Sequence, residues 1–393
     1  MGLLGGWRGA DAVSTPDPLP HETMGNRNSH PGEIQTDQNN GGPGEAGAKT
    51  RQRPSQPPPQ TLADLGEWEL IRRLGAFAPA GQFADDAALL EPIALGGALV
   101  VNTDVLVEGI HFSETTTDPA DVGWRAAAAN LSDLAAMGCT EVVGLTVGLV
   151  APASTPWVWV NGVYGGLREA LDTYGGVLLG GDCSGGAQRL LAITALGHLG
   201  RGAIRRCDGR PGDWLISSGP HGLSRLGLAL LLDQLPAQRR AGLSADLQQR
   251  AITAHRRPRP RFDAVVAVEA SQPAGLPWRV GGTDSSDGLV AAVAAIARTS
   301  GCAAWLEREQ LPLDPELATL PHGEHWCLAG GEDFELVLAL EPAWAEELLE
   351  RLPGARHIGR LAQAATDGQD WPVRWQDNGE PLPQGSEGFS HFR

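Results

Sequence analysis

The sequence predicts a two-domain protein of mixed α/β (α+β) class, and three observations support this. The chain has 393 residues, more than the roughly 100 to 200 of one average domain. From about residue 61 onward, valine-rich runs of strand length alternate with alanine- and leucine-rich runs of helix length. Five segments beside such runs join carboxylates to glycine, serine or another acid. They are Ala84-Asp85-Asp86, Asn102-Thr103-Asp104, Gly180-Gly181-Asp182, Asp284-Ser285-Ser286-Asp287-Gly288 and Gly330-Gly331-Glu332-Asp333.

Residues 1–60 are predicted to be a disordered extension. They are rich in Gly, Pro and polar residues and contain the run Pro57-Pro58-Pro59. Such a segment buries too little apolar surface to offset its chain entropy. The folded part is expected to begin near Thr61 with a helical pattern of leucines.

The predicted first domain covers 61–203. Its strand over 98–107 is rich in valine and carries Thr103 and Asp104 within it. Asp118 and Pro119 are typical of a helix start, and Gly138 is typical of a helix end. The other elements expected here are strands over 142–149, 177–179 and 190–199 and a helix over 157–174.

The predicted second domain covers 204–393, after a charged, glycine-bearing stretch over 200–212. The segment Asp284-Ser285-Ser286-Asp287 directly precedes one of its predicted helices. The elements expected in this half are strands over 213–218 and 334–340 and helices over 222–234, 258–270 and 288–298.

The charge of the chain excludes some classes of partner. A net charge of −17 and a pI near 5.0 argue against binding nucleic acid or an anionic membrane, because both would repel the protein. The only lysine is Lys49, in the segment predicted to be disordered, so the folded part offers no P-loop lysine. If the protein handles ATP, metal ions and arginine must balance the phosphate charge.

Cysteine usage and hydropathy point to the cytoplasm. The five cysteines are odd in number and form no C-x-x-C pair, which argues against a disulfide framework or a structural zinc site. No run approaches the roughly 18 apolar residues of a membrane helix. The N-terminus also lacks the apolar core of a secretory signal.

The acids admit both a functional and a structural interpretation. Asp104 in a valine-rich strand is costly unless it is paired or metal-bound. Asp284 and Asp287 either cap a helix or, with the serines between them, hold Mg²⁺ and phosphate. Gly180-Gly181-Asp182 is either a phosphate-approach loop or a glycine turn with an incidental acid. The positions of Ser, Cys and His indicate no nucleophile and base pair.

Taken together, these segments resemble the thiamine-monophosphate kinase family, within the aminoimidazole-ribonucleotide synthetase-like ATP enzymes. The resemblance covers roughly 61–393. It implies that family's two-domain fold, with an N-terminal domain that forms the dimer and a C-terminal α/β domain. The matching segments are Asp85-Asp86-Ala87, Thr103-Asp104 with His111-Phe112, Asn130-Leu131-Ser132-Asp133, Gly180-Gly181-Asp182, Arg206 before Pro211-Gly212-Asp213, Arg257-Pro258-Arg259-Pro260-Arg261, Ser286-Asp287-Gly288, Gly330-Gly331-Glu332-Asp333 and Gly388-Phe389-Ser390-His391-Phe392.

The resemblance implies direct transfer of the γ-phosphoryl group of ATP to thiamine monophosphate, in a homodimer that uses several Mg²⁺ ions. It implies that the substrate is bound by His111, Glu332 and Phe389, and ATP by Gly181, Asp182, Arg206 and Ser286. It implies a metal site made of Asp86, Asn102, Thr103, Asp104, Asp133, Asp182, Asp284 and Asp287. No residue is assigned as an acid or base.

Two departures and several alternatives accompany the resemblance. Ala84 stands where the family usually has glycine, and Asn102 stands where it usually has a hydroxyl residue. A hydrogenase-maturation or selenophosphate-synthesising enzyme is expected to carry a reactive cysteine or selenocysteine that is not found here, since the chain ends Ser390-His391-Phe392-Arg393. A purine-pathway synthetase and a catalytically silent nucleotide-binding homologue stay open as alternatives.

Overall fold

The structure is a computed structural model that describes residues 60–79, 98–364, 372–383, 385, 386 and 388. Residues 57–393 form one compact unit. The extension predicted over 1–60 lies outside the described residues, apart from Gln60. No helix in the described ranges has the length and apolar character needed to cross a bilayer. The domain boundary near residue 203 stays a prediction.

The first half of the chain forms a four-stranded sheet in the order β1-β4-β2-β3. The β1–β4 and β4–β2 pairs are antiparallel, and β2–β3 is parallel. The strands are β1 (Leu99–Val107), β2 (Cys139–Ala151), β3 (Val177–Gly185) and β4 (Leu190–Leu199), and the helices are α1 (Leu62–Leu74), α2 (Pro119–Ala136) and α3 (Trp157–Tyr174). The predicted elements of this half are present, but β3 continues through Gly180-Gly181-Asp182 instead of ending in a loop there.

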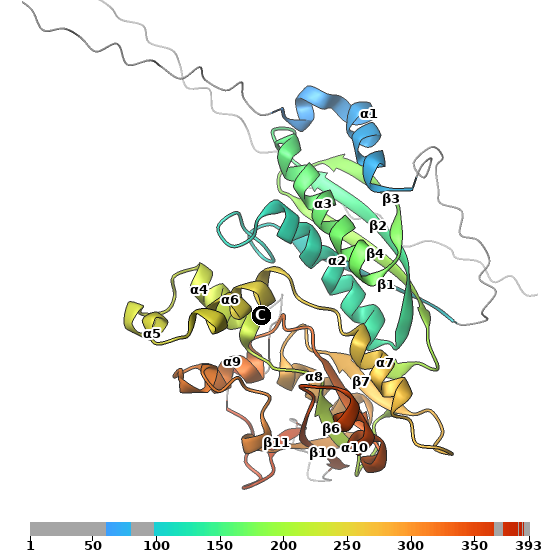
Figure 1. Cartoon of the computed structure of the whole chain (residues 1–393), viewed down its shortest axis with the longest axis vertical. Coiled ribbons are helices and arrows are strands. Elements are labelled where there is room, and N and C mark those ends of the chain that lie inside the picture. Colours follow the sequence, from blue (N-terminus) through green and yellow to red (C-terminus); the bar gives the residue numbers. More distant parts are fainter. Residues whose placement is uncertain (1–59, 80–97, 365–371, 384, 387, 389–393) are drawn as a thin grey trace, which may run out of the picture. The chain divides into compact units, whose positions relative to one another are not determined.

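Helices α2 and α3 lie side by side on the sheet (Figure 1), and two glycines let them approach closely. A Cβ added at Gly123 would lie 1.9 Å from the carbonyl oxygen of Val163, and one at Gly166 would lie 1.8 Å from that of Ala120. Helix α2 begins after Asp118 with Pro119 in its first turn, as the sequence predicts. Its alanines join the core between the helices and the sheet.

The other face of the sheet carries exposed apolar side chains. Burial alternates along β1, so that Leu99, Val101 and Val105 are 51%, 63% and 43% exposed, whereas Leu106 is buried. Contiguous exposed apolar surface of this kind is typical of an interface.

The second half forms a seven-stranded mixed sheet in the order β11-β8-β10-β6-β9-β7-β5. Its strands are β5 (Ile204–Arg205), β6 (Trp214–Ser217), β7 (Val280–Asp284), β8 (Cys302–Leu306), β9 (Leu336–Leu340), β10 (Arg356–Gln363) and β11 (Val373–Trp375). Its α-helices are α4 (Leu223–Leu231), α5 (Ala237–Ala241), α6 (Ala245–Arg256), α7 (Phe262–Ala270), α8 (Leu289–Thr299), α9 (Gly323–Ala329) and α10 (Pro342–Arg351). Four short 3₁₀ helices are η1 (Gly75–Phe77), η2 (Arg206–Asp208), η3 (Arg308–Gln310) and η4 (Leu317–Thr319).

This sheet is packed on both faces. Apolar residues of α8 join one hydrophobic cluster, and those of α7 and α10 join another. Ala135 and Ala136 at the end of α2 belong to the second cluster, so the first half of the chain packs directly on this sheet.

The sequence predicts β6, β9, α4, α7 and α8 in this half, and all five are present. Helix α7 starts at Phe262, later than expected, since Pro258 and Pro260 cannot continue a helix. Strand β7 and helix α6 were not predicted. The glycines of Val280–Asp284 weaken its strand signal, and the polar residues of Ala245–Arg256 lower its apolar content.

Candidate functional site

Four aspartates from three elements gather beside the end of α2. Asp104 comes from β1, Asp133 from α2, Asp284 from the end of β7, and Asp287 from the turn before α8. Burial, then the charges of Asp284 and Asp104, raise the pKa of Asp133 to about 7. Burial also raises the pKa of Asp284 to about 6 and that of Asp104 above its usual value, with Asp287 adding to both shifts. We call Asp104, Asp133, Asp284 and Asp287 the acid cluster.

Neighbouring polar side chains hold the acid cluster in position. Ser132 donates a 2.8 Å hydrogen bond to Asp284, and Asn102 Nδ2 donates one of 2.8 Å to Asp133. Asn130, fully buried on α2, accepts hydrogen bonds from the Asp104 backbone amide and from Asn102. The predicted strand, helix and loop motifs therefore converge, as the resemblance implies for these acids.

Arg206 is the cation beside this cluster. Its charge lowers the pKa values of Asp133 and Asp284, though by less than burial raises them. Its Nε donates to Thr283 Oγ1 at 3.0 Å, which anchors the guanidinium at the end of β7. One arginine beside four carboxylates leaves an excess of negative charge.

The residues of the acid cluster fit a magnesium site. The side-chain oxygen of Asn102 is buried and accepts no hydrogen bond within the described residues, so a hard oxygen is available next to Asp133. Among the same residues, no three His, Cys, Asp or Glu side chains form a ready-made metal cage. Mg²⁺ usually binds through one or two carboxylates together with waters and phosphate oxygens, and the close carboxylates here suit that mode.

Asp104 and Asp287 of the acid cluster line a pocket of about 890 Å³. Five residues predicted from the sequence line it: Asp104, His111, Ser286, Asp287 and Glu332. The pocket is also lined by residues not predicted from the sequence, among them Arg125, Arg225, His255, His325 and Trp326. Arg125 offered the clearest signal, because it is a charged residue within an alanine-rich helix.

The loop that carries Glu332 is held by three different contacts. Arg125 donates to Glu332 at 2.5 Å, and the Glu332 amide donates to Ser286 O at 2.7 Å. Asp333 accepts from the amides of Gly222 and Ser224 at the start of α4, where it satisfies unpaired helix donors. Glu332 itself has φ 58°, a left-handed conformation that a non-glycine residue keeps only when its surroundings impose it.

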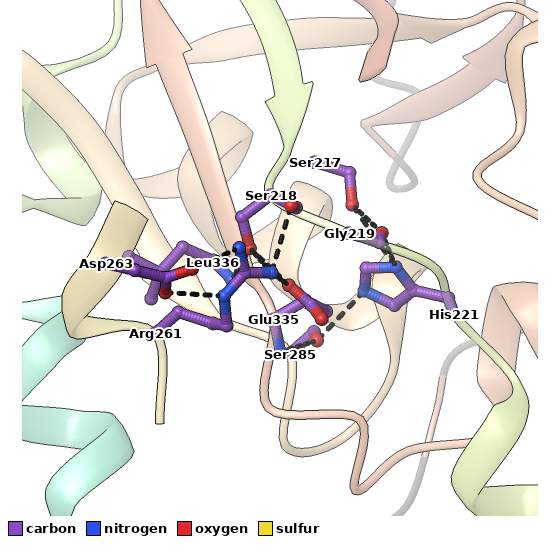
Figure 2. Close-up of polar contacts among 9 residues, drawn as sticks. All are labelled: Ser217, Ser218, Gly219, His221, Arg261, Asp263, Ser285, Glu335 and Leu336. Carbon is purple, nitrogen blue, oxygen red and sulfur yellow. Dashed lines mark hydrogen bonds and ion pairs between the residues drawn. The ribbon is translucent and has the colours of Figure 1, made fainter. Parts of the chain in front are cut away.

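A second polar network lies behind the Asp284–Asp287 segment (Figure 2). His221, fully buried, contacts Ser285 Oγ at 2.9 Å through Nε2 and Gly219 O at 3.3 Å through Nδ1. Because a carbonyl oxygen only accepts, Nδ1 carries the proton and Nε2 accepts from Ser285. Burial lowers the pKa of His221 to about 4, which keeps the ring neutral.

The same network fixes Glu335. Arg261 pairs with Glu335 and with Asp263, and Ser218 donates to Glu335 at 2.5 Å (Figure 2). The Glu335 amide donates to Ser285 Oγ at 3.2 Å. Ser285 is therefore the shared partner that joins the Asp284–Asp287 segment to the loop beginning at Glu332.

Two predicted residues, Thr103 and Asp182, lie on the uncovered face of the first sheet, whereas Gly181 pairs in register with Val147, Ile193 and Asp104 and so lies on the covered face. Thr103 hydrogen bonds there to Thr194 at 2.8 Å. Gly181 and Asp182 are exposed on β3, with β4 and β2 between them and β1. Asp182 pairs with Gly148 of β2, Gly148 pairs with Ala192 of β4, and Ala192 pairs with Val105 of β1. Asp182 therefore lies on the same face of the sheet as Val105, and on the opposite face from Asp104. A single chain does not bring these side chains to the pocket.

Two further predicted site residues, Asp86 and Phe389, lie outside the described residues, as does Ala84. Their roles stay predictions. Gly388, next to Phe389 in the sequence, lines the pocket.

Comparisons with known proteins agree with this geometry. Residues 84–199 match the family model for the AIR synthase related protein, N-terminal domain. The chain is 46% identical over 334 residues to thiamine-monophosphate kinase of Prochlorococcus marinus, covering 85% of this chain and 98% of that protein. The structure of thiamine-monophosphate kinase from Stenotrophomonas maltophilia matches with a TM-score of 0.64 at 31% identity, over 79% of this chain and 95% of that one. AaThiL complexed with AMPPCP and TMP matches with a TM-score of 0.64 at 28% identity, over 85% and 99% of the two chains.

We expect Asp133→Asn to stabilise the metal-free protein. A carboxyl whose folded pKa is raised from 3.8 to about 7 costs stability as pH rises through that window, because the folded state then holds the proton that the unfolded state has lost. The gain should be roughly 1–3 kcal/mol near pH 7.5 and smaller near pH 5. Urea unfolding with EDTA at both pH values measures it. A loss of stability that is equal at both pH values contradicts this electrostatic account.

We expect His221→Phe to destabilise the protein by about 1–3 kcal/mol near pH 7, because the buried Ser285 hydroxyl loses its acceptor. The exposed His322→Phe is the control and should change stability by less than about 0.5 kcal/mol. The folded pKa of His221, about 4, lies below its ordinary value of 6.5, so its contribution is present above pH 6.5 and is lost as pH falls towards 4. The stability difference between wild type and variant should therefore shrink on acidification, and a constant difference would contradict the neutral buried ring.

Proposed function

Because the chain belongs to the thiamine-monophosphate kinase family, we propose that it transfers the γ-phosphoryl group of ATP to thiamine monophosphate, giving thiamine diphosphate and ADP. Support comes from relatives that carry this activity in their name and from the fold shared with AaThiL complexed with AMPPCP and TMP. The observation that carries the proposal is the pocket, where Asp104 and Asp287 of the acid cluster and the predicted substrate residues His111 and Glu332 line one cavity. On this proposal the chain catalyses the last step of thiamine diphosphate biosynthesis.

The proposal includes several Mg²⁺ ions, because both substrates are anionic and Arg206 offsets the negative charge of the acid cluster only in part. When bound, Mg²⁺ would neutralise the negative charge of the phosphates. The chain supplies Asp104, Asp133, Asp284 and the Asn102 oxygen for this purpose. Ser286 and Arg206 are proposed to contact ATP, and the start of α8 offers backbone amides to the phosphates.

His111 and Glu332 are proposed to bind thiamine monophosphate in the pocket. The acceptor needs no strong base, since a phosphate monoester with a second pKa of about 6 is largely deprotonated at neutral pH. The buried histidines are unsuited to proton transfer, because burial lowers the pKa of His221 to about 4 and that of His255 to about 3. Direct in-line transfer would then depend on positioning and charge stabilisation.

A homodimer formed through the uncovered face of the first sheet is part of the proposal. Leu99, Val101 and Val105 form an exposed apolar row on β1, which a second copy would bury. Asp182 lies on the same face, so this predicted ATP contact of β3 would lie at or beside the interface.

We also propose a cytoplasmic location, which is supported by the odd number of cysteines and the lack of a C-x-x-C pair in the sequence. The alternatives from sequence are a purine-pathway synthetase-like enzyme and a catalytically silent nucleotide-binding homologue. Neither is favoured by a specific observation.

The purified chain should convert thiamine monophosphate and ATP to thiamine diphosphate in the presence of Mg²⁺. Thiamine and aminoimidazole precursors, offered in parallel, should give no product by chromatography. Asp133→Asn should abolish turnover while leaving the protein folded, because it removes a metal-site carboxylate. Asp182→Asn should also abolish turnover. Product from the purine precursors, or ATP binding with no turnover of any substrate, would support an alternative instead.

We expect Val101→Asp to convert the dimer to a monomer, because the charge would be buried in the proposed interface. Light scattering after size exclusion measures the mass. Val266→Asp is the matched control, since Val266 is 57% exposed on α7, away from this face, and should leave the mass unchanged. A dimer that survives Val101→Asp would exclude this face as the interface.

A further inference from the structure

Arg125 is a buried cation at the meeting point of three segments that line the pocket. Its side chain is 4% exposed although it comes from the alanine-rich helix α2. One terminal nitrogen donates to Glu332 Oε1 at 2.5 Å and to His111 O at 3.2 Å. The other donates to His255 O near the end of α6. One guanidinium thus joins both described residues that are proposed to bind thiamine monophosphate.

Glu332 depends on this arginine for its charge balance. Its other basic neighbour is His255, whose Nδ1 lies 3.6 Å from Glu332 Oε2, but burial and the nearby arginines lower the pKa of His255 to about 3. Arg125 is therefore the one charged cation paired with Glu332 among the described residues. Without it, a carboxylate on a left-handed backbone would lose the contact that fixes its direction.

The hydrogen bond from Arg125 to His111 O holds a second segment of the pocket, the turn after β1. His111 follows β1, and its ring nitrogen Nδ1 accepts from the Val107 amide at 2.9 Å. The backbone of the same turn is held by Arg125. Arg125 Nε is buried and has no hydrogen-bond partner within the described residues, so one donor of a pocket-lining side chain is unused.

We propose that Arg125 is a positioning residue of the acceptor site, which holds Glu332 and the His111 turn in the geometry that receives thiamine monophosphate. The inference rests on the proposed function. The inference goes beyond the proposed function because the sequence resemblance assigns Arg125 no role. Within the described part of the chain, Arg125 hydrogen bonds to Glu332, His111 and His255 and not to Ser286 or Arg206, which are proposed to contact ATP, so the effect should be selective for the acceptor.

A purely structural clamp is the competing interpretation, and Arg257 provides a matched control for it. Arg257 bonds Asp121 of α2 at 2.6 Å and Glu169 of α3 at 2.6 Å. It connects the end of α6 to the helices of the first half, as Arg125 does, but does not line the pocket. Loss of either arginine removes a hydrogen bond that links the end of α6 to α2.

The test compares steady-state kinetics of the full-length chain, Arg125→Met, Arg125→Lys and Arg257→Met. For Arg125→Met, KM for thiamine monophosphate should rise at least about tenfold, while KM for ATP changes by less than about threefold, as expected for loss of one charge-assisted hydrogen bond. Arg125→Lys should recover part of the loss, since it keeps a charge but not the fork of donors. Arg257→Met should leave both KM values close to wild type.

The outcomes separate the inference from the function. An unchanged KM for thiamine monophosphate in Arg125→Met, or an equal rise in both KM values, overturns the positioning role. If Arg125→Met fails to fold by circular dichroism, Arg125→Lys decides, and a selective rise in the acceptor KM is again the expected result. Failure of the wild-type chain to use thiamine monophosphate overturns the proposed function, and the inference with it.

Discussion

The structure depends on one electrostatic constraint: four aspartates gather beside the end of α2, burial disfavours the charge of three of them, and Arg206 lowers the pKa of two by less than burial raises it. Burial raises the pKa values of Asp133, Asp284 and Asp104, so the folded chain holds these groups at a cost. Asn102, Asn130 and Ser132 contribute hydrogen bonds that fix the acids without neutralising them. The packing of the surrounding core offsets this electrostatic cost. In the proposed function, bound cations would balance the charge of the acids.

The packing of helix α2 and the arginine contacts of the loops hold the acid cluster in position. Helix α2 carries Asn130, Ser132, Asp133 and Arg125, and its glycine contact with α3 and its alanine contacts with both sheets fix its position. Arginines hold the loops: Arg125 pairs with Glu332, and Arg261 with Glu335. The chain has a single lysine, at position 49, so arginines supply nearly all of its side-chain positive charge. Arginines order the loops, and on the proposed function the phosphates are left to metal ions and Arg206.

The sequence predicted the local elements well where periodicity was strong. Helices α2, α3 and α8 and strands β1, β4 and β9 appear close to the expected positions. Strand β7 was not predicted, because its two glycines are more typical of a loop than of a strand. Asp104, Asp133, Asp284 and Asp287 were predicted together only through the family resemblance, since spacing along the chain does not reveal which strand ends meet. Asp182 could not be placed from the sequence. Its motif resembles those of the other acids, but strand order and register place it on the face of the first sheet opposite Asp104. Arg125 was missed because a charged residue in an alanine-rich helix is a weak signal until its partners Glu332 and His255, more than 100 residues away, are known.

The most direct test of the central claim is a titration of the metal-free protein with Mn²⁺, followed by the electron paramagnetic resonance signal of the unbound ion near pH 6 and near pH 7.5. Raised carboxyl pKa values mean that protons compete with the metal, so binding should be clearly tighter at the higher pH, with protons released on binding. Replacing Asp133 with Asn should remove much of that pH dependence. Equal binding at the two pH values without proton release, or no binding at either, would contradict the account of the acid cluster as a cation site.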